Sequence, residues 1–175
     1  MRILGKAVVG RGQADRSLAS YRLKIEEALG NAPHPGSLNL VLRQPIVLDP
    51  QRAIGASDGK RWFWLAQCAA TPCLLTRWRG CPLHVVEVVA AVRLRDLEGE
   101  AGALQIDVDN DLLLPVPLTN RLFWVLLWAG RQHWFYASDR YLKFRQRLGG
   151  KHLEGQAAVA ARCRHTGSYV KEVKP

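Results

Sequence analysis

Hydrophobic and polar residues alternate along several short stretches of the chain, which is the pattern of strands with one buried face. The alternation is clear at residues 37–42, where Leu38, Leu40 and Leu42 alternate with other residues, and a strand-like segment also runs from Ile3 to Val9. Further short β-type runs, bounded by turn-forming residues, follow at residues 45–48, 61–68, 73–78, 84–89 and 103–108. So many short strands predict a mostly β fold in which the strands form a small barrel.

One segment has helical rather than alternating spacing. Apolar residues recur every three or four positions over residues 18–29, and charged residues occupy the other face. This spacing predicts a helix that Ser17 or Ser20 caps at its start and that Gly30 ends. A brief helical turn is also expected at residues 94–97.

The character of the chain changes near residue 110. Residues 121–129 are rich in apolar and aromatic side chains, and residues 139–148 have the spacing of a basic amphipathic helix. We therefore expect a barrel at residues 1–110 and a C-terminal α/β extension at residues 111–175, either packed on the barrel or appended to it.

The formal net charge of +10 in 175 residues favours anionic partners such as nucleotides, nucleic acid or an acidic membrane surface. Residues 1–110 carry 14 Lys and Arg against 11 Asp and Glu, whereas residues 111–175 carry 11 against 4. Most of the excess positive charge thus lies in the extension, among aromatic residues. That mixture suits single-stranded nucleic acid or a membrane interface, and it equally suits a segment that packs on the barrel.

The apolar content of 48% is sufficient for a folded core. Four cysteines have spacings that match neither a zinc site nor a redox CxxC pair, so we expect reduced, mostly buried thiols. The first residues run straight into a predicted strand, with no apolar stretch of signal-peptide type before it. We therefore expect a cytoplasmic protein.

Two motifs near the N-terminus can hold phosphate and metal. The first is the glycine-rich turn Gly10-Arg11-Gly12-Gln13-Ala14-Asp15, whose backbone N–H groups can cradle phosphate oxygens. The second is Pro35-Gly36-Ser37-Leu38-Asn39, in which a hydroxyl and a side-chain amide are two residues apart. The period of a strand puts Ser37 and Asn39 on one face, where their oxygens can bind a hard cation together.

Glu87 is the evident candidate for a catalytic base. It lies within the apolar run at residues 85–92, where loss of hydration would raise its affinity for a proton. The alternative role is that of a glutamate in a structural salt bridge on a barrel strand.

The glycine turn, the helix, the Pro-Gly-Ser-Leu-Asn segment and residues 85–95 together resemble the archaeal CTP-dependent riboflavin kinases, over residues 3–108. The resemblance implies a cradle-loop β-barrel and an Mg²⁺-dependent kinase that transfers the γ-phosphate of CTP to riboflavin, giving FMN. Ser37, where family members usually have threonine, and Asn39 would bind magnesium, and Glu87 would face the flavin and the hydroxyl to be phosphorylated. The residues that would bind the nucleotide are Gly10, Arg11, Gly12, Gln13, Ala14, Asp15, Val92, Arg93, Leu94 and Arg95.

One position departs from the family pattern and bears on the acceptor. Family members carry a flavin-contacting threonine eight positions before the glutamate, and Arg79 stands there in this chain. A long cation can hold a carboxylate or a phosphate, so a second hypothesis is a CTP-dependent kinase of another acceptor, such as a carbohydrate or an anionic metabolite. A third is a barrel without catalysis that binds nucleic acid or an acidic membrane surface.

Overall fold

The computed structural model describes residues 1–10, 12, 14–54, 60–97, 102–127, 143 and 159–161. The strands in these segments are β1 (Arg2–Val8), β2 (Leu38–Leu42), β3 (Val47–Leu48), β4 (Arg61–Cys68), β5 (Thr71–Trp78), β6 (Val85–Ala90), β7 (Ala103–Asp107) and β8 (Leu113–Leu114). The α-helices are α1 (Ala14–Leu18), α2 (Arg22–Leu29) and α3 (Leu118–Leu127). Short 3₁₀ turns occupy Ala19–Tyr21, Pro50–Arg52, Leu94–Leu97 and Asn110–Leu112.

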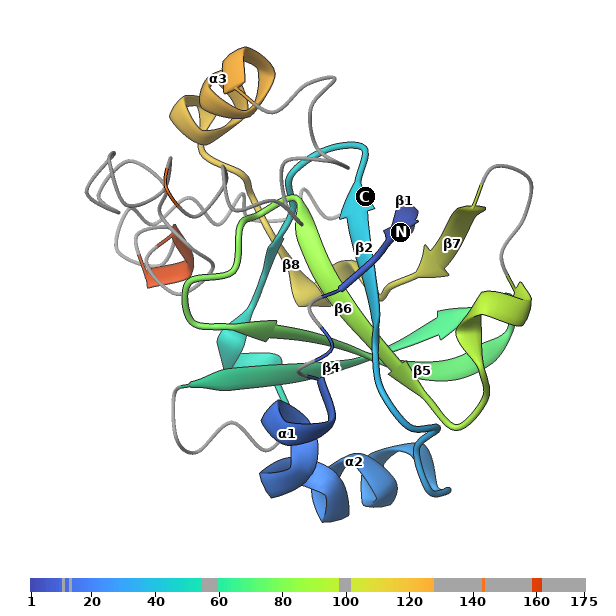
Figure 1. Ribbon diagram of the computed structural model, residues 1–175. Coiled ribbons are helices and arrows are strands. Elements are labelled where there is room, and N and C mark those ends of the chain that lie inside the picture. The colour runs from blue at the N-terminus through green and yellow to red at the C-terminus, as the bar shows by residue number, and fades with distance from the viewer. Residues whose placement is uncertain are drawn as a thin grey trace, which may run out of the picture.

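The longer strands form a closed antiparallel barrel in the order β1-β2-β6-β5-β4-β7, and β1 closes it by pairing with both β2 and β7 (Figure 1). β3 and β8 form a separate two-stranded sheet. The mostly β fold and the small barrel predicted from the alternating pattern are thus confirmed, as is the helical turn at residues 94–97.

Alternate residues of the strands fill the barrel interior. Leu38, Leu40 and Leu42 of β2 lie in one buried cluster with Val86 and Val88 of β6. The residues between them therefore face the outer side of the barrel, because successive side chains of a strand point to opposite faces.

Three cysteines are free and buried, as the sequence predicted: Cys68, Cys73 and Cys81. Burial, with a smaller contribution from Cys68, raises the pKa of Cys73 to about 12, so this thiol stays protonated at neutral pH. Cys163 lies outside the described residues.

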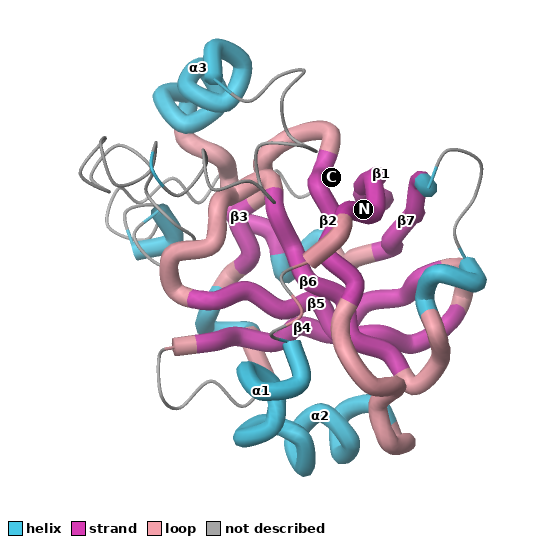
Figure 2. Tube along the Cα trace, in the orientation of Figure 1, coloured by secondary structure: helices cyan, strands magenta, loops and turns pink. Residues whose placement is uncertain are grey.

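Helices α1 and α2 lie together on one side of the barrel and cover the outer face of β4, β5 and β6 (Figure 2). The buried cluster between helices and strands consists of Leu18, Ile25, Leu29, Phe63, Leu74 and Val89. The rings of Tyr21 and Phe63 add a tilted contact with centroids 5.3 Å apart. The packing of these helices fixes the position of the segment that links β1 to α1.

The predicted end of the helix is confirmed, but its predicted cap is wrong. Gly30 ends α2 with a left-handed φ of 70°, which glycine adopts without strain. At the other end, α2 begins after Tyr21 with no side-chain cap, since α1 and a 3₁₀ turn already precede it without a break. Ser17 lies inside α1, where its hydroxyl donates a hydrogen bond to the Ala14 carbonyl at 3.1 Å.

The prediction that β2 has only one buried face is also wrong. All five residues of β2 are buried, including Asn39 at 7% exposure. The reason is that the segment following β1 lies against the outer face of β2, with Gly10 in close contact with Asn39.

The hairpin between β4 and β5 turns through two alanines with positive φ, Ala69 at 46° and Ala70 at 64°. Left-handed backbone costs a residue with a Cβ atom about 1–2 kcal/mol, and glycine avoids that cost. Ala70→Gly should therefore raise the free energy of unfolding by about 1 kcal/mol, measured by urea denaturation. Ala103→Gly on the exposed side of β7 is the matched control and should instead lower it; equal effects of the two changes would contradict the strain at Ala70.

The chain beyond residue 110 contributes to the packing beside the barrel. β8 pairs with β3, and Val159 and Ala160 are buried in one cluster with Val47 and Leu83. Helix α3 lies on the far side of the barrel from α1 and α2 (Figure 1), so the apolar run predicted near residues 121–129 is helical up to residue 127. The predicted helix at 139–148 lies outside the described residues except for residue 143. No helix in the described segments has the length and apolar character to cross a membrane.

Candidate active site

The register of the barrel places the predicted metal ligand and the predicted base directly opposite each other. Asn39 of β2 pairs with Glu87 of β6, and Glu87 pairs in turn with Thr76 of β5. All three face the outer side, because their neighbours along each strand fill the core. Side chains opposite each other on antiparallel strands have Cβ atoms about 4.5–5.5 Å apart, so Asn39 and Glu87 lie within reach of one small ligand.

Gly10, from the glycine-rich turn, lies against the side-chain amide of Asn39. A Cβ atom at Gly10 would lie 2.3 Å from Nδ2 of Asn39, which is far inside van der Waals contact. The two predicted motifs therefore meet in space, and any Cβ atom at this position would displace the Asn39 amide. Gly12 has a left-handed φ of 66°, Arg11 and Gln13 lie outside the described residues, and nothing is described of the Asp15 side chain.

The second predicted nucleotide segment lines one pocket with the metal motif. The pocket has a volume of about 190 Å³ and is formed by residues 34–38, by Val88 and Ala90, and by residues 92–95. Gly36 turns the chain into the pocket with φ of 90°, and the buried hydroxyl of Ser37 has no hydrogen-bond partner among the described residues. The guanidinium groups of Arg93 and Arg95 make this pocket suited to an anion.

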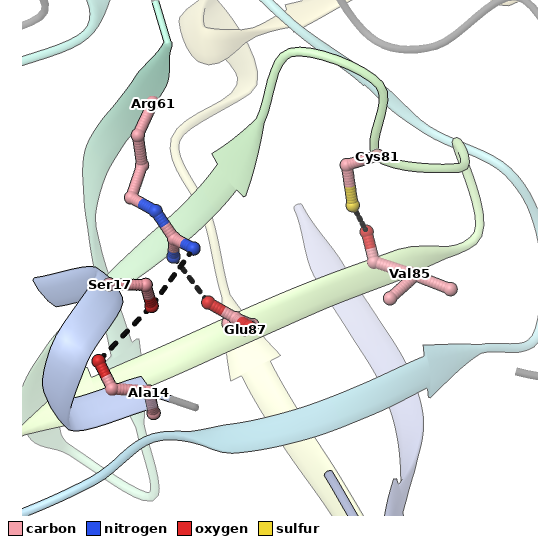
Figure 3. A network of polar contacts seen from close by, with 6 residues as sticks. All are labelled: Ala14, Ser17, Arg61, Cys81, Val85 and Glu87. Atoms are coloured by element: carbon pink, nitrogen blue, oxygen red, sulfur yellow. Dashed lines mark hydrogen bonds and ion pairs between the residues drawn. The ribbon is translucent and has the colours of Figure 1, made fainter. Parts of the chain in front are cut away.

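Glu87 forms a buried ion pair, the alternative role that the sequence left open, with a partner that the sequence did not identify. The Nη1 atom of Arg61 donates to Oε2 of Glu87, and Nη2 donates to the Ser17 hydroxyl at 3.4 Å. Figure 3 shows Arg61 reaching from β4 toward Glu87, with Ser17 approaching from α1. Arg61 and Glu87 are only 7% and 8% exposed. The signal in the sequence was a cation at the start of an otherwise apolar strand segment, where a buried charge needs a partner.

Arg79 directly follows β5, at the same end of the barrel as Arg61. Its backbone N–H donates to the Lys60 carbonyl at 2.9 Å, and the preceding residue, Trp78, pairs with Arg61 across the strands. The Arg79 side chain is exposed and has no ion-pair partner among the described residues.

Arg77, two positions before Arg79, has a structural role. It is fully buried and donates hydrogen bonds to three backbone carbonyls, those of Val85 at 2.8 Å, Ile46 at 2.9 Å and Leu83 at 2.7 Å. Burial lowers its pKa to about 10, which still leaves the guanidinium charged at neutral pH. Arg77 thus holds the β5–β6 connection and the entry to β3 in place beneath the site.

His84, which is buried near Arg77, should make the stability of the fold depend on pH. Burial, reinforced by the positive charge of Arg77, lowers the pKa of His84 to about 3 from an ordinary value of 6.5. His84 is therefore neutral in the folded protein, whereas in the unfolded chain it takes up a proton below about pH 6.5. Its contribution to stability is present above that pH and is lost as the pH falls toward 3.

We expect His84 to add to the free energy of unfolding a slope that grows as the pH falls below about 6.5 and approaches about 1.4 kcal/mol per pH unit near pH 5. Denaturant unfolding across this range measures the slope. His84→Gln should remove this contribution to the slope, even if the variant is less stable. An unchanged slope in His84→Gln would show that other groups carry the acid sensitivity.

Ser37, directly before β2, and Asn39, within it, carry oxygens that fit a magnesium ion. The fit rests on the buried Ser37 hydroxyl without a partner and on the Asn39 amide held beside Glu87. Hydroxyl, amide and phosphate oxygens are ligands that magnesium accepts, and this ion commonly uses few protein ligands together with substrate phosphates.

Comparison with curated proteins finds archaeal riboflavin kinases. The chain is 29% identical to the riboflavin kinase of Pyrobaculum islandicum over 126 residues, which is 62% of this chain and 60% of that protein. It is 27% identical to that of Methanocella arvoryzae, over 59% of this chain and 54% of the relative, and 32% identical to that of Archaeoglobus fulgidus, over 52% and 46%. No family model matches the chain. The chain therefore resembles the riboflavin kinases, and it spans roughly half to three fifths of the length of these relatives.

Proposed function

We propose that the chain is a riboflavin kinase that transfers the γ-phosphate of CTP to a hydroxyl group of riboflavin with the help of Mg²⁺. The observation that carries the proposal is the pairing of Asn39 with Glu87, with Gly10 packed on the Asn39 amide. A turn suited to phosphate, a candidate metal ligand and a candidate base thus lie at one place on the barrel. The similarity to proteins named riboflavin kinase supports the choice of reaction.

The residues on the two sides of the Asn39–Glu87 pair would have different roles, one side binding the phosphate donor and the other the acceptor. On the donor side, Arg93 and Arg95 beside the Ser37 pocket would offset the charge of the phosphates. Ser37 and Asn39 would hold the magnesium ion, which when bound neutralises charge on the transferred phosphate. Positioning and charge stabilisation of this kind supply most of the catalysis in phosphoryl transfer.

On the acceptor side, the Glu87 carboxylate would accept the hydrogen bond of the attacking hydroxyl and take its proton during transfer. Its buried place opposite Asn39 keeps the base close to the phosphate that the metal would hold. Arg61 prevents the carboxylate from being an isolated buried charge.

The test is a phosphorylation assay with the full chain, Mg²⁺, riboflavin and either CTP or ATP, with products separated by chromatography. We expect CDP and FMN in equal amounts from CTP, little from ATP, and none after addition of EDTA. Titration calorimetry that shows no binding of CDP in the presence of Mg²⁺ would overturn the proposal.

Arg79 favours a second candidate, a kinase of an anionic acceptor. Its side chain is exposed at the barrel end where Arg61 and Trp78 pair, and it has no ion-pair partner among the described residues. A panel of carbohydrates and carboxylated or phosphorylated alcohols, assayed with CTP, distinguishes the two. Consumption of CTP with riboflavin alone would remove this second candidate.

A further inference from the structure

Arg61 holds the candidate base from a strand that is not adjacent to it. We infer that Arg61 is a positioning residue, which fixes the Glu87 carboxylate toward the acceptor hydroxyl and joins it to the helix that follows the phosphate-binding turn. The inference rests on the proposed function and assigns a role within the same site.

The geometry of the barrel makes the reach of Arg61 specific. Arg61 pairs with Trp78 at one end of β4, whereas Glu87 pairs with Thr76, so the arginine side chain crosses β5 diagonally to reach β6. Both members of the ion pair are buried, at 7% and 8% exposure. The orientation of a buried guanidinium is restricted, because the planar group donates hydrogen bonds in fixed directions.

Arg61 engages one oxygen of the carboxylate. It donates to Oε2 of Glu87, and Oε1 accepts no hydrogen bond from any other residue that the structure describes. The last torsion of a glutamate side chain is soft, so a carboxylate held by one oxygen presents the other in a defined direction. The arrangement suits a base that must meet a hydroxyl at hydrogen-bond distance.

The other arm of the fork binds helix α1. Nη2 of Arg61 donates to the Ser17 hydroxyl at 3.4 Å, and that hydroxyl donates to the Ala14 carbonyl at 3.1 Å (Figure 3). Ala14 begins α1 and also belongs to the glycine-rich turn at residues 10–15. Arg61 therefore fixes Glu87, on the acceptor side, relative to α1, on the donor side. Transfer between two bound substrates requires the reacting groups to be positioned relative to each other in this way.

The test compares Arg61→Lys with wild type in the phosphorylation assay. Lysine keeps the positive charge beside Glu87 but cannot hold the carboxylate and Ser17 in one planar fork. We expect kcat to fall about tenfold or more, with KM for CTP and riboflavin within about twofold, because misplacement of a reacting group affects the transition state most. Arg52→Gln, which removes an exposed ion pair with Asp111, is the matched control and should keep wild-type kcat.

Ser17→Ala removes the link between Arg61 and α1, together with the hydrogen bond from the same hydroxyl to the Ala14 carbonyl, and leaves the Arg61–Glu87 ion pair in place. It therefore tests the inference even if Arg61→Lys does not fold. We expect a smaller fall in kcat, about threefold, with unchanged thermal unfolding. In a double-mutant cycle, most of the loss of kcat caused by Arg61→Lys should disappear once Glu87 is replaced by glutamine, because that part of the effect acts only through the carboxylate. The part carried by Ser17, about threefold, should remain.

Two outcomes overturn the inference alone: folded Arg61→Lys and Ser17→Ala variants with wild-type kcat, or an Arg61→Lys effect that is undiminished in the Glu87→Gln background. A wild-type chain that transfers no phosphate from CTP to riboflavin would overturn the proposed function, and the inference with it. The wild-type rate thus separates the two failures.

Discussion

Glu87→Gln is expected to reduce kcat for riboflavin phosphorylation by about 10²–10⁴-fold, because an amide cannot take the proton of the acceptor hydroxyl. The KM for CTP should change little, since the pocket that contains Ser37, Arg93 and Arg95 does not include residue 87. Steady-state assays with saturating Mg²⁺ measure both constants. A folded Glu87→Gln protein with kcat within tenfold of wild type would exclude Glu87 as the base.

The same substitution should also destabilise the protein, which has to be separated from the loss of catalysis. The charge of Arg61 would remain buried without its counter-charge, at a cost of about 3 kcal/mol in the free energy of unfolding. The double variant Arg61→Gln with Glu87→Gln removes both charges and should recover most of that stability while staying inactive. Recovery of activity together with stability would mean that Glu87 serves only as a structural salt bridge.

Gly10→Ala is expected to weaken the binding of CDP with Mg²⁺ by about tenfold to a hundredfold. The new Cβ atom would lie 2.3 Å from Nδ2 of Asn39, so the buried amide must move away from its place opposite Glu87. Groups that hold a metal ligand in position typically contribute this much to metal affinity. Titration calorimetry with CDP, with and without Mg²⁺, measures the loss.

The matched control for Gly10→Ala is Gly30→Ala. Gly30 has a left-handed φ of 70° and open space where a Cβ atom would lie, so alanine there strains the backbone without displacing any neighbour. It should lower stability by about 1 kcal/mol and leave nucleotide affinity unchanged. Equal losses of affinity in the two variants would indicate a general effect of strain, and would contradict a specific role for the contact between Gly10 and Asn39.

The strands and the faces of their side chains could be predicted from the sequence because both follow from local alternation. Leu38, Leu40 and Leu42 indicated which side of β2 faces the core, and this placed Asn39 on the other side. Which strand would lie beside β2 could not be predicted, because that depends on how the whole barrel closes. The pairing of Asn39 with Glu87 is therefore a product of tertiary structure.

The partners of the buried polar side chains could not be predicted from the sequence either, because they too depend on tertiary structure. Arg61 and Glu87 are 26 residues apart, and Arg61 reaches across an intervening strand, so no short-range spacing marks the pair. Arg77 donates to backbone carbonyls, and no pattern of side chains in the sequence reveals such bonds. Burial of β2 on both faces was missed because the covering segment comes from the turn after β1.

The closed register of the barrel also limits how the length of this protein can change in evolution. β2 pairs on one side with β1 and on the other with β6, so a single inserted or deleted residue within it would shift both ladders. Such a slip would turn Asn39 inward and bring a leucine to face Glu87. Insertions and deletions should accordingly accumulate in the connections between strands and helices. A homologue whose β2 or β6 is longer or shorter by an odd number of residues should lack the pairing of Asn39 with Glu87.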